Sequence, residues 1–448
     1  MQFRCAPFAW ILPTALLMAL AAAALAADDD APVESPPDTV GPHPRLAPVE
    51  KRLIPRIKIA TAVGWPTGAT PRPAEGLAAN AFATNLEHPR WLQVLPNGDV
   101  LMAETNAPDR PEDASGLKGA VMRSVQRKAG ATATPGNRIL LLRDADDDGV
   151  AETRTVFIDG LNAPFGMALV GSDLYVADTD AVLRFDYRTG EPKIETAGTV
   201  LTRLPAGSIN HHWTRNIIAS PDGSHLYVTV GSNSNVAENG MAAEEGRAAI
   251  WEIDRGSGNK RLYATGLRNP NGMAWEPQTG ALWTVVNERD ELGNDLVPDM
   301  LTSVHEGAFY GWPYSYYGAH VDDRVKPQRP DLVARAIAPD YALGAHVAAL
   351  GLASAAGSAL PPPFQHGMFI GEHGSWNRKP AVGYKVVFVP FAAGRPSGPP
   401  LDVLNGFVND AGEAFGRPVG VAVDRKGALL VADDVGNAVW RVQARRAK

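Results

Sequence analysis

One pattern of apolar and polar positions returns several times along the chain. Each copy opens with Pro or Gly, continues with alternating apolar residues, turns at Pro, Asp or Gly, and closes with a Leu-Tyr-Val type stretch and a polar residue. Alternation with a period of two predicts β-strands, and the turn between them predicts a hairpin. Six copies can be argued, at residues 88–106, 163–180, 214–232, 269–288, 365–374 and 417–434, of which the fifth is the weakest.

The spacing of these copies is typical of the blades of a β-propeller. From Leu174 to Leu226 is 52 residues and from Leu226 to Leu282 is 56, enough for about four short strands and their turns in each unit. A β-sandwich is the alternative architecture, although it would not need a recurring unit of this length. Longer gaps at 107–135 and 305–360 indicate loops inserted on one face, and such loops often form binding sites.

Helical patterns are scarce in the same part of the chain. After the amino-terminal segment, no stretch keeps apolar residues at spacings of three and four for more than about two turns. The 44 Gly and 37 Pro residues also suit a turn-rich protein. We therefore predict an all-β fold, a six-bladed β-propeller with inserted loops on one face.

The amino-terminal residues differ from the repeats. Residues 1–26 combine one Arg, a long apolar run and the small-residue sequence Ala24-Leu25-Ala26, which is typical of a cleaved secretory signal peptide; an uncleaved membrane anchor is the alternative. Residues 27–57 are rich in Pro and acidic residues and predict an extended linker. The folded domain is then 58–448. We expect a periplasmic or secreted protein with no stable membrane insertion after cleavage.

Charge, cysteine content and missing motifs exclude several classes of protein. The formal net charge is −7 and the only basic cluster is the short RRAK end, so nucleic acid is not an expected partner. The only cysteine, Cys5, falls inside the predicted signal peptide. The chain has no GxSxG, HExxH, P-loop or GxGxxG motif, which argues against acyl transfer, zinc proteolysis, NTP hydrolysis and Rossmann nucleotide binding.

Side chains that could bind a ligand or transfer a proton stand immediately before the first strand of several repeats. In a propeller the innermost strands all begin at one mouth of the central channel, so these residues should converge although they are far apart in sequence. They are His211, His212, Arg215, Asn216, Arg268, Asn269 and Arg417. Buried cations repel each other unless an anion or carboxylates neutralise them, and histidine can accept a proton near neutral pH. The pattern predicts an anion site with a general base.

Two acidic segments are candidate cation sites. Asp144, Asp146 and Asp148 follow the DxDxDG spacing of calcium loops, although Thr155 stands where the twelfth-position acid is expected. An acidic hairpin tip is the alternative there. Residues 287–299 (NERDELGNDLVPD) carry five acidic residues directly after an inner strand pair, and a solvated acidic loop is the alternative for them.

Five motifs in order resemble one known family. HHWTRNIIASPDGSHLYVTVGS, LRNPNGMAW, VNERDELGNDLVPD, FYGWP and EHGSWNRKP together are similar to the sorbosone dehydrogenase branch of the soluble sugar dehydrogenases that use pyrroloquinoline quinone. The likeness runs from about residue 58 to 443. It implies a six-bladed propeller that holds the quinone flat across the channel, with a calcium ion against the quinone and a histidine as general base.

The resemblance also implies roles for individual residues. His212 matches the general base, with His211 as the alternative. The implied quinone-binding residues are Arg268, Asn269 and Arg417, with either Arg378 or Lys379 as the basic residue over the quinone. In the same segment, Trp376 offers a flat surface for binding. Glu288 and Arg289 match the backbone positions that hold calcium. Ser232 stands where the glucose-oxidising members carry an aspartate beside the histidine, so either another acid, from 288–295, supports His212 or the activity is changed or lost.

The sequence thus predicts a periplasmic oxidoreductase that oxidises a sugar or sugar aldehyde of the aldose or sorbosone type. Hydride would pass to bound pyrroloquinoline quinone, and a quinone or a cytochrome would accept the electrons afterwards. The alternatives are a propeller that binds a sugar or a protein without turnover, and a lactonase-type hydrolase with a metal in the channel.

Overall fold

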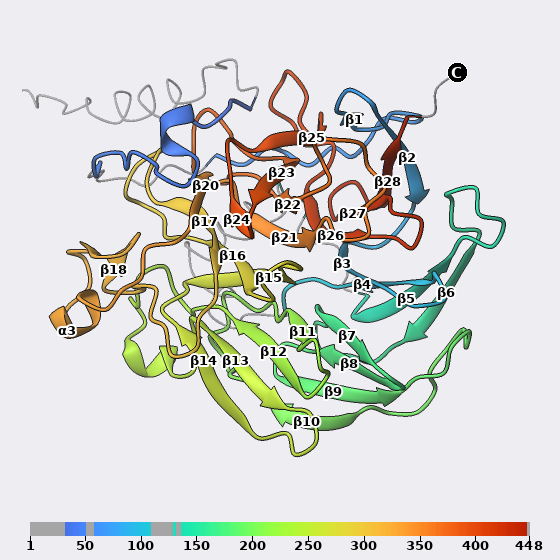
Figure 1. Cartoon of the computed structure of the whole chain (residues 1–448), viewed down its shortest axis with the longest axis horizontal. Coiled ribbons are helices and arrows are strands. Elements are labelled where there is room, and N and C mark those ends of the chain that lie inside the picture. Colours follow the sequence, from blue (N-terminus) through green and yellow to red (C-terminus); the bar gives the residue numbers. More distant parts are fainter. Residues whose placement is uncertain (1–31, 51–57, 109–127, 129, 131–135, 446–448) are drawn as a thin grey trace, which may run out of the picture.

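Six antiparallel sheets surround a common centre in the computed structural model, which describes residues 32–50, 58–108, 128, 130 and 136–445 (Figure 1). The predicted all-β, six-bladed β-propeller is confirmed. In each blade four strands follow one another outward from the centre. The predictions on residues 1–26 lie outside the described residues. Within the described residues, no helix has both the length and the apolar character needed to cross a membrane.

The blades are numbered in chain order. Blade one is β3 (Pro89–Val94), β4 (Val100–Glu104), β5 (Arg138–Arg143) and β6 (Thr153–Ile158); blade two is β7 (Met167–Val170), β8 (Asp173–Ala177), β9 (Ala181–Asp186) and β10 (Thr199–Arg203). Blade three is β11 (Ile217–Ala219), β12 (His225–Val230), β13 (Ala249–Asp254) and β14 (Lys260–Thr265); blade four is β15 (Asn269–Trp275), β16 (Leu282–Asn287), β17 (Pro298–Ser303) and β20 (Tyr341–Ala345).

The last two blades include strands from the amino-terminal part of the chain. Blade five is β21 (Ala349–Ser354), β22 (Gly367–Glu372), β23 (Lys385–Ala392) and β25 (Leu401–Asn405), with β1 (Arg72–Pro73) outside β25 and β24 (Arg395–Pro396) beside β23. Blade six is β26 (Pro418–Val423), β27 (Leu429–Asp433), β28 (Ala438–Ala444) and β2 (Leu77–Ala83). Because β2 pairs with β28, the two ends of the domain close the ring within one sheet.

The repeats identified in the sequence are the two inner strands of each blade, with one exception. In blade five the segment 365–374 covers only β22, while the innermost strand β21 lies upstream across a long connection. That connection explains why the fifth copy is the weakest.

Glycines let the innermost strands approach one another. A Cβ atom at Gly272 in β15 would lie 2.5 Å from the amide nitrogen of Leu352 in β21, and one at Gly420 in β26 would lie 2.7 Å from the carbonyl oxygen of Arg90 in β3. Gly166 and Gly351 are similarly close to the backbone of the next blade. The glycine in the repeats is therefore a packing requirement of the ring, because real side chains do not approach a backbone so closely.

The register brings the same two positions of every blade to one end of the propeller. Pro89 at the start of β3 pairs with Glu104 at the end of β4, Asn269 pairs with Asn287, and Pro418 pairs with Asp433. Residues just before each first strand and just after each second strand thus gather at this end, which we call the mouth.

An extended segment, residues 32–50, packs along blades four and five and is called the strap (Figure 1). Gly41 exchanges two backbone hydrogen bonds with Ala342 of β20, both 2.9 Å long, and Lys385 of β23 binds the Glu34 carboxylate at 2.6 Å. The strap includes the short 3-10 helix η2 (Pro37–Thr39). Residues 32–50, the described part of the segment predicted to be an extended linker, are therefore docked along the domain.

The insertion between β17 and β20 forms a separate small unit. It contains the hairpin β18 (Ser315–Tyr316) and β19 (His320–Val321) and the helix α3 (Pro330–Val333). This unit corresponds to the first part of the predicted 305–360 inserted loop. A further 3-10 helix, η4 (Met241–Glu244), lies between β12 and β13.

Candidate functional site

The mouth contains a buried ionic cluster centred on Asp434, which follows β27. Its carboxylate binds Arg90 Nη1 at 2.5 Å and His373 Nε2 at 2.9 Å, and His88 Nε2 lies 3.5 Å away. Burial would raise the pKa of Asp434, but His373, His88 and Arg90 together hold it far below its usual range. Burial lowers the pKa of His373 to about 4 despite the carboxylate. At neutral pH the cluster is therefore an ionised Asp434 beside a charged Arg90 and a neutral His373.

Arg417, directly before β26, is a second buried cation, and unlike Arg90 it is not paired with Asp434. Its guanidinium donates from Nη2 to the Tyr384 hydroxyl at 3.1 Å and lies over the Tyr384 ring at 5.0 Å. Its Nε is buried without a hydrogen-bond partner. Among the residues that the structure describes, no carboxylate forms an ion pair with Arg417. A buried cation in this state is costly unless an anion binds beside it.

On the blade-four side of the mouth, Arg268 is held by backbone oxygens and one carboxylate. Nη1 donates to the Glu288 carbonyl at 2.7 Å, and Nη2 to Asp290 at 3.3 Å. Asp290 also binds His346 at 3.3 Å and the Asn377 amide at 2.7 Å. Burial opposes ionisation, but His346, Arg268 and Asn377 lower the pKa of Asp290 to about 2.

The pKa of His346 is shifted in the opposite direction from that of His373. Burial lowers it, but Asp290 and the Gly293 carbonyl, which lies 2.8 Å from Nε2, raise it overall. His346 thus adds a further titratable ring to the wall of the mouth, in addition to His88 and His373.

His212 lies beside Arg268 and Asn269. A Cβ atom at Gly231 would collide with both the His212 Cβ and the Asn269 side-chain oxygen, so these two residues flank the same glycine. Ser232 donates its backbone N–H to the Arg268 carbonyl at 2.8 Å. The Asn269 side-chain oxygen is buried without a hydrogen-bond partner. The predicted convergence of these three residues is thus present in the structure.

The orientation of the His212 ring is set by Ser232. Nδ1 lies 2.8 Å from the Ser232 carbonyl and 3.1 Å from its hydroxyl oxygen. A carbonyl can only accept, so Nδ1 carries the proton in the neutral ring and Nε2 carries the lone pair. Behind Ser232, Ser234 donates to the buried Glu244 at 2.5 Å. A backbone carbonyl therefore stands in the place where a supporting acid was expected.

Three of the four acids of 288–295 are engaged with other cations. Glu288 binds the Arg289 guanidinium at 3.0 Å, Asp290 binds Arg268, and Asp295 binds Arg378 at 2.7 Å. None of these three ion pairs includes His212, so they give no evidence for the expected support of His212 by an acid of this segment.

Arg215 does not belong to the mouth as the sequence predicted. It is fully buried and donates to the carbonyls of His212, Thr214 and Pro205, and burial lowers its pKa. Its place before a first strand predicted a position in the mouth, but its Nη atoms donate to carbonyls of this loop and to the Asn210 side chain, and its Nε is buried without a partner. It stabilises the loop that carries His212.

The connection after β22 carries the remaining predicted quinone ligands. Arg378 is buried, bonded to Asp295 and to the Ala345 carbonyl, with Nε unpartnered, and burial lowers its pKa. The Lys379 carbonyl accepts from Asn294 at 2.8 Å. Trp376 is 39% exposed. The structure places these residues near the blade-four side of the mouth, through Asn294, Asp295 and Ala345.

In the segment predicted to hold calcium, backbone carbonyls are occupied by the guanidinium of Arg268, and the side chain of Arg289 turns to the insertion. Arg268 Nη1 donates to the carbonyls of Asn287 and Glu288, at 3.4 and 2.7 Å. The Arg289 side chain is 0% exposed and binds Asp322 and two backbone carbonyls of the insertion. A calcium ion here would have to displace Arg268 from these carbonyls.

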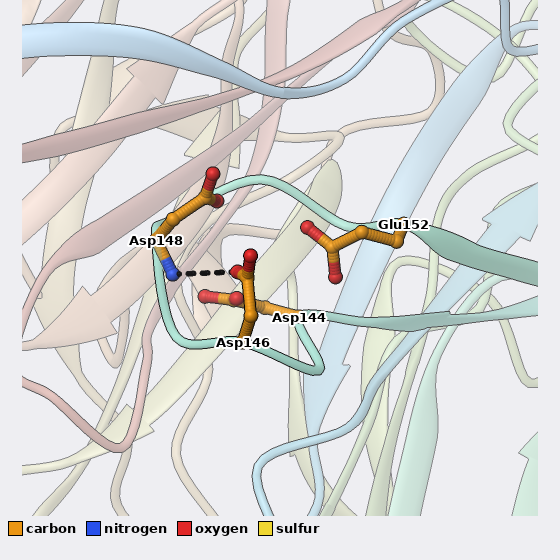
Figure 2. A group of neighbouring side chains, drawn as sticks. All are labelled: Asp144, Asp146, Asp148 and Glu152. Carbon is orange, nitrogen blue, oxygen red and sulfur yellow. Dashed lines mark hydrogen bonds between the residues drawn. The ribbon is translucent and has the colours of Figure 1, made fainter.

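The second predicted calcium position is a compact acidic turn between β5 and β6 (Figure 2). One carboxylate oxygen from each of Asp144, Asp146, Asp148 and Glu152 lies within 4.8 Å of the others. Lys426 approaches Asp144 at 3.5 Å. Since Glu104 pairs with Arg138 and Val100 with Leu142, this turn lies at the end of blade one opposite to the mouth. An ion there has no contact with the mouth residues.

Four mouth residues were not predicted as site residues. In HPRWLQV of the first repeat, His88 stands directly before the proline that opens the first strand, as Arg417 does in GRPVGV, and Arg90 follows that proline. This shared position was the available signal. His373 and Asp434 follow second strands, a position that the search before first strands did not cover.

Fold and mouth define the protein as a six-bladed β-propeller whose mouth combines buried cations with a histidine. The chain belongs to the TrAA12-like family, whose model matches residues 132–307 and 328–445. The predicted resemblance to the family of quinone-dependent sugar dehydrogenases is thereby confirmed.

Two curated relatives and one solved structure illustrate the family. The chain is 24% identical over 335 residues to the pyrroloquinoline quinone-dependent pyranose dehydrogenase of Coprinopsis cinerea, covering 61% of this chain and 45% of that protein. It is 23% identical over 192 residues to the aldose sugar dehydrogenase YliI of Escherichia coli, covering 40% and 50%. The matches thus span about half the length of these relatives. A Trichoderma reesei carbohydrate-active enzyme of family AA12 shares the fold, with a TM-score of 0.68 and 18% identity over 87% of this chain and 99% of that one.

Proposed function

We propose that the chain is a pyrroloquinoline quinone-dependent sugar dehydrogenase that works in the periplasm or outside the cell. Arg417 carries this proposal, because it is a buried guanidinium with no carboxylate partner among the described residues. The names of the curated relatives support the reaction class. An aldose or sorbosone-type substrate and the secretory location rest on the sequence patterns.

The residues of the mouth suit a flat polyanion. Arg417, Arg268 and Arg90 would bind its carboxylates, and the unpartnered Nε atoms of Arg417 and Arg90 would gain acceptors. The unpartnered Asn269 oxygen would accept a donor from the same ligand. Bound pyrroloquinoline quinone supplies a two-electron acceptor for the hydride of a sugar carbon.

His212 would perform the proton transfer. Oxidising a hydroxyl-bearing carbon to a carbonyl releases the hydroxyl proton, and His212 Nε2 accepts it as general base. The Ser232 carbonyl holds the ring in the tautomer that this role needs. The imidazolium that forms keeps its Nδ1–H bond to that carbonyl. The Ser232 carbonyl would orient the His212 ring without a carboxylate, although Ser232 stands where the glucose-oxidising members carry an aspartate.

Calcium is the second proposed cofactor, at the acidic turn of Asp144, Asp146, Asp148 and Glu152. Carboxylate oxygens at alternate positions of a tight turn are ligands that calcium prefers. Because this turn lies opposite to the mouth, the ion would stabilise blade one and take no part in proton transfer.

The test combines quinone binding with turnover. Purified protein is mixed with pyrroloquinoline quinone and calcium, quinone binding is followed by absorption, and dye reduction is measured over a panel of aldoses and ketoaldehydes. Arg417→Met should weaken quinone binding, whereas His212→Ala should keep binding but lower the rate by at least about a hundredfold. Arg188→Met, at an 83% exposed position, is the matched control and should change neither.

The outcomes separate the alternatives. A chain that binds sugar but neither quinone nor dye would be a binding propeller, and lactone hydrolysis without quinone would indicate the hydrolase. Quinone binding that survives Arg417→Met unchanged would overturn the assignment of the mouth.

A further inference from the structure

The turn after β12, residues 232–234, lies between His212 and a buried acid. Ser232, Ser234 and Glu244, the last residue of η4, are all buried. Placing a carboxylate inside a protein is costly unless its oxygens are hydrogen-bonded. The roles proposed above for the mouth residues leave Glu244 unassigned.

Both carboxylate oxygens of Glu244 bind this turn. Oε2 accepts the backbone N–H of Asn233 at 2.7 Å, and Oε1 accepts the Ser234 hydroxyl at 2.5 Å. The Asn233 side-chain amide also donates to the Ala243 carbonyl at 2.7 Å. Hydrogen bonds to an ionised group are about twice as strong as those between neutral groups. Glu244 therefore fixes the backbone of two consecutive residues of the turn.

The same turn determines which atoms of Ser232 face His212. The Ser232 hydroxyl donates its proton to the Ser234 carbonyl at 2.7 Å. With that proton engaged, the hydroxyl can only accept from His212 Nδ1, which lies 3.1 Å away. The Ser232 carbonyl lies 2.8 Å from the same nitrogen. Two acceptors therefore face Nδ1, and both favour the ring that carries its proton there.

Two buried guanidinium groups hold the backbone on either side of this arrangement. Arg215 donates to the His212 carbonyl at 2.8 Å, and Arg247 donates to the Gly231 carbonyl at 3.4 Å. Burial lowers the pKa of Arg247 to about 10, and Glu244 opposes this shift. Arg247 therefore remains charged at neutral pH, and the carboxylate that binds the turn offsets its charge.

We propose that Glu244 is a positioning residue for His212. By fixing residues 232–234, it keeps the carbonyl and hydroxyl of Ser232 against Nδ1, so that Nε2 retains the lone pair that accepts a proton. Glu244 thus supplies through the turn the acidic support that the sequence led us to expect for His212. The use of His212 as a base rests on the proposed function, whereas the orientation of its ring does not.

The tautomer of His212 can be measured by NMR on the protein without quinone, with its histidines labelled with 15N. The protonated and unprotonated nitrogens of a neutral imidazole have well-separated 15N chemical shifts, so the spectrum reports which nitrogen carries the proton. The chain has 10 histidines, and the signal that disappears in His212→Gln identifies His212. At about pH 8, above the usual pKa of histidine, the unaltered protein should carry the proton on Nδ1.

Variants of the turn assign the effect to Glu244. Glu244→Ala removes both acceptors and should give a mixture of the two tautomers. Glu244→Gln keeps one acceptor for the Asn233 N–H and can donate its amide to the Ser234 hydroxyl, so it should retain most of the Nδ1–H form. Ser234→Ala removes one of the two bonds and should give a smaller shift than Glu244→Ala. Glu245→Ala, at the exposed next position, is the matched control and should change nothing.

Dye reduction then measures the consequence for turnover. Glu244→Ala should lower kcat by about tenfold or more, because a general base contributes about a hundredfold or more only when it is positioned to take the proton. KM and quinone binding, followed by absorption, should stay nearly unchanged, and Glu244→Gln should recover most of kcat. A merely structural role would instead lower the urea midpoint and weaken quinone binding, and the folded protein would keep the tautomer of His212.

Two results would overturn the inference: an unaltered protein with the proton on Nε2, or a folded Glu244→Ala protein that keeps the Nδ1–H form unchanged. If Glu244→Ala does not fold, Ser234→Ala decides, and an unchanged tautomer there counts against the role of Glu244. Normal dye reduction by Glu244→Ala would refute this inference and leave the proposed function intact. The expected tautomer shift in a protein that reduces no dye with any sugar would do the reverse.

Discussion

Replacing Asp434 by asparagine should remove a large part of the stability of the fold. The carboxylate is 2% exposed and holds Arg90 at 2.5 Å and His373 at 2.9 Å. Asparagine keeps the volume of the side chain, so no cavity forms, but the charge that neutralises Arg90 disappears. Leaving one partner of a buried ion pair uncompensated costs about 3–5 kcal/mol in the free energy of unfolding.

Urea unfolding at pH 7 without cofactor, followed by Trp fluorescence, measures this cost. The matched control is Asp331→Asn, because Asp331 binds Arg329 at 2.6 Å but is 60% exposed. Loss of that surface pair should cost at most about 1 kcal/mol. If Asp434→Asn costs no more than the control, the mouth does not depend on buried charge pairing and the argument is refuted.

The pH dependence of the difference follows from the depressed pKa of Asp434. A carboxylate with a lowered folded pKa stabilises the fold fully above its unfolded pKa of about 4 and loses that contribution as the pH falls below it. The gap between the two proteins should therefore stay constant from pH 7 down to about 4 and narrow below it. A gap that closes between pH 7 and 5 would contradict an ionised Asp434.

Three further predictions concern other parts of the molecule. Gly272→Ala should lower the free energy of unfolding by about 1–3 kcal/mol, because its Cβ would lie 2.5 Å from the next innermost strand. Gly256→Ala should not, because its Cβ would meet its nearest neighbour at an ordinary contact distance of 3.5 Å; equal effects would reject the packing argument. The pKa of His373 is lowered to about 4 in the fold, so its contribution to stability should be complete above about pH 6.5 and be lost as the pH falls towards 4. The free energy of unfolding of His373→Gln, measured in urea, should therefore change less with pH over this range than that of the unaltered protein. Equal changes in the two proteins would contradict this prediction. Calcium should raise the Tm relative to EDTA, and Asp146→Asn should abolish most of that shift; a shift that survives would place the ion elsewhere.

Several features of this protein could be predicted because they depend on local periodicity. Alternating apolar residues and short turns define strands without reference to the rest of the chain, and their return at intervals above fifty residues indicates blades. The topology then decides which ends of the strands meet. This is why His212, Arg268 and Asn269 could be brought together from the sequence, and why Arg417 could be assigned to the start of a first strand.

The directions of the charged side chains were decided by tertiary structure. Arg215 and Arg268 stand at equivalent positions before first strands, yet Arg215 turns to carbonyls of its own loop while Arg268 turns to the Glu288 carbonyl after β16. Asp434 takes its partners from blades one and five, so no local pattern could identify the cluster. The strap, similarly, is a polar sequence whose position depends on backbone groups of β20. Local spacing determines where a strand begins, whereas the burial and pairing of a charge depend on neighbours that only the closed ring supplies.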